Sequence, residues 1–75
     1  MSEQTNELTK LSEIARDMQL PRNMREKAID QLGNIYSHEA LLALLEIAAN
    51  ENLTNSDRDR ALKQARNVVK KTSPQ

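Results

Sequence analysis

The sequence is short of several residue types, and each shortage narrows the class of protein. Of its 75 residues none is Cys, which excludes disulfide bridges, thiolate metal sites and a cysteine nucleophile. One Gly, two Pro and one aromatic residue stand among many Ala, Leu, Glu, Lys, Arg and Gln, a composition that favours helices over strands. No apolar run is long enough for a membrane span, and residues 1–10 lack the apolar region of a signal peptide. We therefore expect a soluble, cytoplasmic protein.

An excess of one charge is also missing, since 11 basic side chains balance 11 acidic ones. The chain as a whole therefore has no field that attracts polyanions. Charge is nevertheless uneven, at −3 over residues 37–53 and +4 over residues 57–75. The basic segment could contact phosphates, but there are no aromatic side chains beside it to stack on bases. Nucleic-acid binding stays the less favoured alternative, and its candidate residues are Arg58, Arg60, Lys63, Arg66, Lys70 and Lys71.

What the chain does have is an internal repeat. Residues 8–35 and 41–68 align without a gap at a shift of 33 residues, with ten identities in 28 positions. A fixed period of this length predicts stacked copies of one supersecondary unit. We expect a single domain over residues 1–75, with repeat one at about 7–36, repeat two at about 37–71 and a frayed tail at 72–75. The identical pairs are Leu8/Leu41, Leu11/Leu44, Glu13/Glu46, Ile14/Ile47, Ala15/Ala48, Leu20/Leu53, Arg25/Arg58, Ala28/Ala61, Gln31/Gln64 and Asn34/Asn67.

Apolar residues recur at helical spacing in four segments, two in each repeat. Pro21 separates the first segment from the second, because Pro fits a first helical turn but not a helix interior. The apolar stripes are Leu8, Leu11, Ile14, Ala15 and Met18; Met24, Ala28, Leu32 and Ile35; Leu41, Leu44, Ile47 and Ala48; and Ala61, Ala65 and Val68. The expected N-terminal caps are Asn23 with Glu26, Ser37, and either Thr54 with Asp57 or Ser56 with Asp59.

The segment 24–35, followed by residues 40–48, resembles a HEAT-type repeat, and most closely the short HEAT-like repeats found in phycobilin lyase subunits. The residues that match this pattern are Met24, Arg25, Ala28, Leu32 and Gly33. The second copy keeps Arg58 and Ala61 but has Asp57 and Ala65-Arg66 in place of the apolar residue and the Leu-Gly pair. The resemblance implies an all-α, four-helix right-handed α-α superhelical stack of two HEAT-like helical hairpins. HEAT-like families include scaffolds, bilin lyases and DNA glycosylases, so the resemblance implies no particular chemistry.

The polar face of the second helix of each repeat is the predicted protein-binding groove. The resemblance implies this assignment, because the corresponding face in HEAT-like stacks is the inner, concave surface. Its first half is acidic and its second half basic, which suits a partner of mixed charge. An ordinary solvated face is the alternative. The groove residues are Glu26, Asp30 and Asn34 from repeat one, and Asp59, Lys63, Arg66, Asn67 and Lys70 from repeat two.

A second apolar row, Leu42, Leu45 and Ala49, accompanies the main stripe of the third helix, where the first helix has Thr9, Ser12 and Arg16. A helix that is apolar on two sides must be covered on two sides, so we expect this row to be internal. The alternative is an exposed self-association patch. Because arrays generally need three or more repeats, two repeats alone also favour a homodimer.

Arg25 and Arg58 lie at equivalent positions, close to the apolar stripes, and we expect each to bind a carboxylate or carbonyl within the stack rather than a ligand. His38 has no spaced partner that would make it a catalytic base or a metal ligand. We therefore predict no enzymatic activity, no metal, no cofactor and no small-molecule ligand. The expected function is a protein-protein interaction module, or alternatively an accessory subunit of a larger complex.

Overall fold

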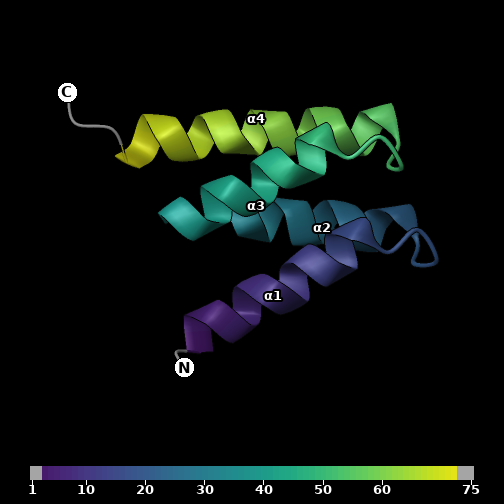
Figure 1. Ribbon diagram of the computed structural model, residues 1–75, viewed down its shortest axis with the longest axis horizontal. Coiled ribbons are helices and arrows are strands. Elements are labelled where there is room, and N and C mark those ends of the chain that lie inside the picture. Colours follow the sequence, from purple (N-terminus) through teal and green to yellow (C-terminus); the bar gives the residue numbers. More distant parts are fainter. Residues whose placement is uncertain (1–2, 73–75) are drawn as a thin grey trace.

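The computed structural model describes residues 3–72, and the side chains of residues 6–72. It is an all-α bundle, with no strand among the described residues. Figure 1 shows the four helices, α1 (Glu3–Arg16), α2 (Arg22–Gly33), α3 (His38–Ala49) and α4 (Asn55–Thr72). Helix α1 begins earlier than the repeat predicts. Thr72, predicted to belong to a frayed tail, is the last residue of α4, while the rest of that tail, 73–75, lies outside the described residues.

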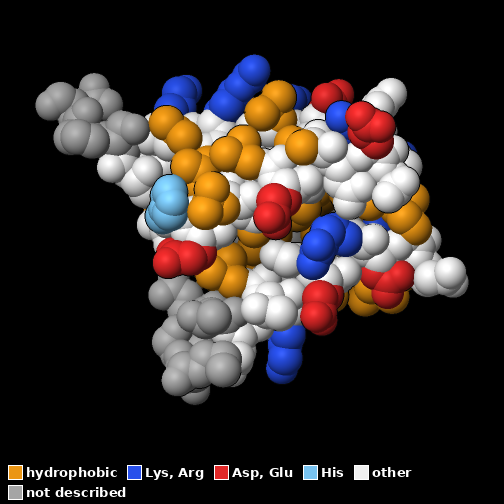
Figure 2. Space-filling view, viewed as in Figure 1, with side chains coloured by type: hydrophobic (Ala, Val, Ile, Leu, Met, Phe, Trp, Pro, Cys, Tyr) orange, Lys and Arg blue, Asp and Glu red, His pale blue; other side chains and the backbone are white. Residues whose placement is uncertain are grey.

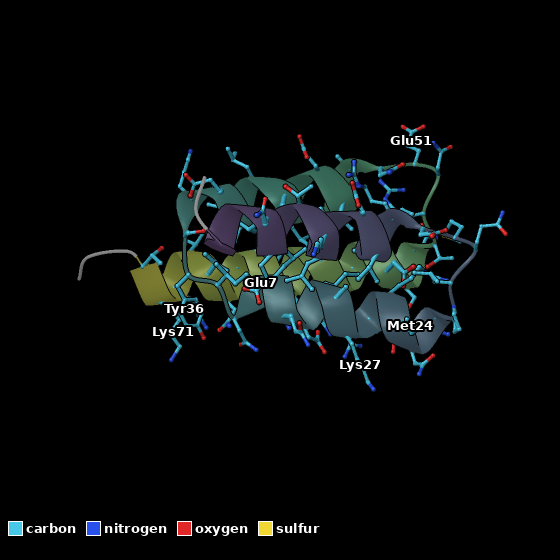
Figure 3. All side chains as sticks on the ribbon, turned by 90° about the horizontal axis from the view of Figure 1, so that it is seen from below. Glu7, Met24, Lys27, Tyr36, Glu51 and Lys71 are labelled. Carbon is cyan, nitrogen blue, oxygen red and sulfur yellow. The ribbon has the colours of Figure 1, made fainter. Side chains whose placement is uncertain are left out.

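The helices form two hairpins that correspond to the two sequence repeats. Helix α1 packs on α2 and α3 on α4, while α2 also packs on α4 and α3, and α1 on α3. Seen from the side of the first hairpin, α1 and α3 form one layer and α2 and α4 form a second layer (Figure 3). The core therefore lies both inside each hairpin and between the hairpins.

The same turn closes both hairpins. In the first, the amide of Gln19 donates to the Asp17 Oδ1 atom at 2.9 Å, and the amide of Leu20 donates to the Asp17 carbonyl at 3.1 Å. In the second, the amide of Asn52 donates to the Asn50 Oδ1 atom at 2.9 Å, and the amide of Leu53 donates to the Asn50 carbonyl at 3.1 Å. Asp and Asn side chains that accept a bond from the amide two residues later stabilise such turns. The repeat thus extends to a hydrogen-bonding pattern that the ten identities do not contain.

Two of the predicted caps are confirmed and one is wrong. The Ser37 hydroxyl accepts from the amide of Ala40 at 3.1 Å, and the Thr54 hydroxyl accepts from the amide of Asp57 at 3.1 Å. Asn23, by contrast, lies inside α2, which follows Pro21 and has no side-chain cap. Pro21, at φ −57°, already has the backbone angle that the first turn needs, so no polar cap has to set the helix start.

The core consists mainly of the predicted stripes, with two exceptions. Met18 is exposed because α1 ends at Arg16, which places Met18 in the turn. Met24 is exposed because its neighbour Arg25 occupies the buried side of α2. The buried apolar residues are Leu8, Leu11, Ala15, Ala28, Ile29, Leu32, Ala40, Leu44, Ile47, Leu53, Ala61, Ala65 and Val68.

The prediction that the second apolar row of α3 is internal is wrong. Leu42 and Leu45 are 48% and 42% exposed, and Ala49 is exposed as well. Helix α1 approaches a neighbouring side of α3, where Thr9, Ser12 and Arg16 line a shallow hollow together with Glu39, Ala43 and Glu46. Because the other three sides of α3 face α1, α2 and α4, this row remains on the one side that no described element covers.

Candidate interaction surfaces

A polar cluster joins α2 to α4 across the two hairpins. Arg60 donates from Nε and Nη2 to the two carboxylate oxygens of Asp30, at 2.9 and 2.8 Å, and the Gln64 amide nitrogen donates to Asp30 Oδ1 at 3.0 Å. The hydrogen bond from Arg60 and its positive charge, with help from Gln64, lower the pKa of Asp30 in spite of partial burial. The same hydrogen bond and carboxylate raise the pKa of Arg60. Asp30 is therefore an ionised carboxylate that already has partners.

The predicted groove is only partly assembled. A shallow hollow of about 600 Å³ between α2 and α4 is lined by Asp30, Ser56, Asp59, Arg60, Lys63 and Gln64. Three of the eight predicted groove residues, Asp30, Asp59 and Lys63, thus lie together. Three other lining residues, Ser56, Arg60 and Gln64, were missed, although the i, i+4 spacing of Arg60 and Gln64 places them on one side of α4.

The other five groove residues lie elsewhere. Glu26 binds Arg22 at 3.0 Å and lies 3.9 Å from Arg60, so its carboxylate is also engaged. Asn34 lines a separate small hollow at the α1–α2 end, beside Glu7 and Gln31. Arg66, Asn67 and Lys70 follow α4 towards its C-terminal end and line none of these hollows.

A buried ion pair links the hairpins near their turns. Arg25 Nε donates to Asp57 Oδ2 at 2.8 Å, and its Nη1 donates to the Leu20 carbonyl at 2.7 Å. The side chains of Arg25 and Asp57 are 7% and 0% exposed. Arg58, the equivalent of Arg25, instead donates to the Ala48 carbonyl at 2.9 Å. The prediction that both arginines bind within the stack is confirmed.

Asp57 differs from its predicted role. The sequence pairs it with Thr54 in an N-terminal cap, and its amide does donate to Thr54, but its carboxylate is fully buried against Arg25. Its second oxygen, Oδ1, has no hydrogen-bond partner among the described residues. A buried carboxylate is tolerated because the guanidinium lies beside it, since an unpaired buried charge is strongly unfavourable. Asp57 therefore depends on Arg25.

An exposed apolar surface lies over α3 and α4. We call it the α3–α4 face and define it as Leu42, Leu45 and Ala49 of α3 with Leu62 and Val69 of α4. The four larger side chains remain between 38% and 48% exposed. Figure 2 shows orange side chains gathered over both helices on this side of the molecule. Contiguous apolar surface of this kind typically marks an interaction site in a soluble protein.

The two edges of the α3–α4 face carry opposite charge. On α3, Glu39 and Glu46 flank the apolar row, and on α4 the exposed Arg66 and Lys70 follow Leu62 at one-turn intervals. In Figure 2, red side chains lie below the orange area along α3 and blue ones above it along α4. The face therefore has an acidic edge and a basic edge.

The single His and the single aromatic residue of the chain lie at the surface. His38 and Tyr36 are exposed at the start of α3 and in the turn before it. Among residues 3–72 no group of three or more His, Asp or Glu side chains is placed to hold a metal ion. None of the helices that the structure describes is long and apolar enough to cross a membrane.

Of the six basic residues of α4, two are engaged within the bundle. Arg60 binds Asp30 and Arg58 binds the Ala48 carbonyl.

Comparison of the chain with protein-family models, with curated proteins and with solved structures finds no match.

Proposed function

We propose that this chain is a non-enzymatic protein-protein interaction module, built from two HEAT-like hairpins, that docks its partner on the α3–α4 face. The observation that carries the proposal is the exposure of Leu42, Leu45, Leu62 and Val69 on adjacent helices. A hairpin repeat buries its apolar side chains against the next unit, and the α3–α4 face has the composition of a surface built to be covered.

The α3–α4 face is a better docking site than the predicted groove between α2 and α4. In that groove the carboxylates of Glu26 and Asp30 already bind Arg22, Arg60 and Gln64. A ligand would have to displace these hydrogen bonds before it could form its own, which reduces the net gain. On the α3–α4 face a partner displaces only water from apolar side chains.

The free energy gained by burying these apolar side chains predicts a modest affinity for the partner. Complete burial of a Leu or Val side chain contributes 1.5–3 kcal/mol, so covering the four partly exposed ones contributes about 3–5 kcal/mol. Association itself costs about 4–15 kcal/mol. The charged edges must therefore add to the apolar term, and we expect a complex of micromolar or weaker affinity.

Site-specific photo-crosslinking in cells tests this proposal. A photoreactive amino acid at position 45 should give a discrete product with a protein whose peptides are identified by mass spectrometry. The same group at position 24 should not, because Met24 is equally exposed but lies outside the α3–α4 face. Addition of Leu42→Glu should strongly reduce the product at position 45. The proposal is wrong if position 45 gives no protein product, or if both positions give the same one.

A further inference from the structure

The α3–α4 face is the counterpart of a surface that is already covered inside the molecule. The repeat shift of 33 residues relates Leu62 to Ile29, and Ile29 is fully buried where α2 meets the second hairpin. It likewise relates Leu42 and Leu45 to residues of α1 that border α3. On the first hairpin this surface is covered by the second hairpin. On the second hairpin the corresponding surface is not covered by any described residue.

From this geometry we infer that the partner is a second copy of the same chain, bound face to face through a two-fold axis that runs along the seam between α3 and α4. The inference rests on the proposed function, since it names the occupant of the same face. A two-fold interface joins one patch to itself, so the apolar row of each copy meets an equally apolar surface.

The charged edges favour this particular arrangement. An axis parallel to the seam lays α3 of one copy over α4 of its partner, which brings the Glu39 and Glu46 edge opposite the partner's Arg66 and Lys70. An axis perpendicular to the seam would lay α3 on α3 and place acidic edges opposite each other. Complementary charges fix the register of an interface and disfavour alternative pairings.

A head-to-tail stack is the main competing arrangement, and the ion pairs oppose it. In such a stack the first hairpin of the next copy would take the place that the second hairpin takes on the first. Met24 would then occupy the position of Asp57, and Arg58 would lack the carboxylate that Arg25 has. The buried link between hairpins could not be repeated at the new junction.

The second link between the hairpins would become repulsive. In a head-to-tail stack Lys27 would occupy the position of Arg60, and it would face Lys63 in the position of Asp30. Figure 3 looks onto the α1–α2 end that would have to enter this junction, and labels Glu7, Met24 and Lys27 there. The lost ion pair and the repulsion between Lys27 and Lys63 therefore make the α1–α2 end a poor cover for the α3–α4 face.

Sedimentation of the purified full chain tests self-association. We expect the mass to rise towards twice the 8.5 kDa of the monomer as the concentration approaches millimolar. Leu45→Glu should raise the dissociation constant at least about tenfold, and the matched control Met24→Glu should leave it within about twofold. Charge reversal by Glu46→Lys or Arg66→Glu should weaken the dimer, and the two reversals together should restore it.

The absence of Cys allows the geometry to be tested with single introduced thiols. When two differently tagged copies carrying Leu45→Cys and Leu62→Cys are mixed and oxidised, we expect a disulfide-linked heterodimer. A preferred link between copies carrying Leu45→Cys and Met24→Cys would overturn the two-fold arrangement in favour of head-to-tail stacking. A monomer at every concentration would overturn self-association. The crosslinking at position 45 would then still decide whether the face binds another protein, so the two failures are distinguishable.

Discussion

The buried pair between Arg25 and Asp57 makes the sharpest prediction about stability. We would replace Arg25 by Met and Asp57 by Leu, singly and together. Each single change leaves the other ionised group inside the bundle without its partner, because the two side chains are only 7% and 0% exposed. Breaking a buried pair in this way costs about 3–5 kcal/mol. Since a domain of 75 residues has an unfolding free energy of about 4–11 kcal/mol, either single change should remove at least about a quarter of the stability.

The double variant should behave differently. With both charges gone, neither group is stranded, and two apolar side chains of similar volume fill the space between the hairpins. Such replacements are often neutral or stabilising, so we expect the double variant of Arg25 and Asp57 to lie within about 2 kcal/mol of the wild type. The large coupling between the two changes is the signature of a buried pair rather than of two independent contacts.

Urea unfolding followed by far-ultraviolet circular dichroism measures these free energies, at concentrations low enough to keep the chain monomeric. In thermal unfolding each single variant should lose at least about 12 °C. Arg22→Met is the matched control, because Arg22 pairs with Glu26 and donates to the Ser56 hydroxyl at the surface, with 64% of its side chain exposed, and its loss should cost about 1 kcal/mol. The reasoning fails if Arg25→Met costs no more than this control, or if the double variant loses the sum of the two single losses.

Three smaller predictions concern the cap, the polar cluster and the close approach of α2 to α4. Ser37→Ala should cost about 1 kcal/mol in urea unfolding by removing the acceptor for the first turn of α3, and Ser37→Asp should restore most of it. Asp30→Asn should cost at most about 1 kcal/mol above pH 4, because the pair with Arg60 is half-exposed. The pKa of Asp30 in the folded chain lies below its ordinary 3.8, so the stabilisation by Asp30 is fully present above pH 3.8 and is lost as the pH falls through the folded-state pKa. The melting temperatures of the wild type and Asp30→Asn should therefore converge in acid, and a difference that persists there would contradict the prediction. Gly33→Ala should destabilise the bundle by about 1–3 kcal/mol and so lower its melting temperature, because a Cβ there would lie 2.9 Å from Gln64 Cβ and overpack the contact between α2 and α4. Helix propensity alone predicts the opposite, so a higher melting temperature would refute this prediction.

Much of the fold is predictable from the sequence because a helix records its own periodicity. The four helices, the two hairpins and the cap at Ser37 follow from local spacing and side-chain chemistry, whereas the structure was needed to choose Thr54 over Ser56 as the cap of α4. The internal roles of Arg25 and Arg58 were also predictable, since each arginine lies close to an apolar stripe.

What the sequence could not predict is which neighbour covers which side of a helix. Periodicity places Leu42 and Leu45 on one side of α3 but does not say whether another helix lies there. Likewise, Arg25 meets Asp57 and Arg60 meets Asp30 across 32 and 30 residues of chain, and these pairs become visible only once the offset between hairpins is known. The predicted groove was incomplete for this reason.

The link between Arg25 and Asp57 has a consequence for protein engineering, because its two halves come from different hairpins. The second hairpin alone carries an Asp at the receiving position and an Arg next to it, at the donating position. A synthetic gene that concatenates residues 37–69, with Lys63→Asp so that Arg60 of the next copy again meets a carboxylate, should therefore yield a rod in which every junction closes with its own salt bridges. Concatenating the first hairpin would not, because Met24 cannot accept a hydrogen bond from arginine.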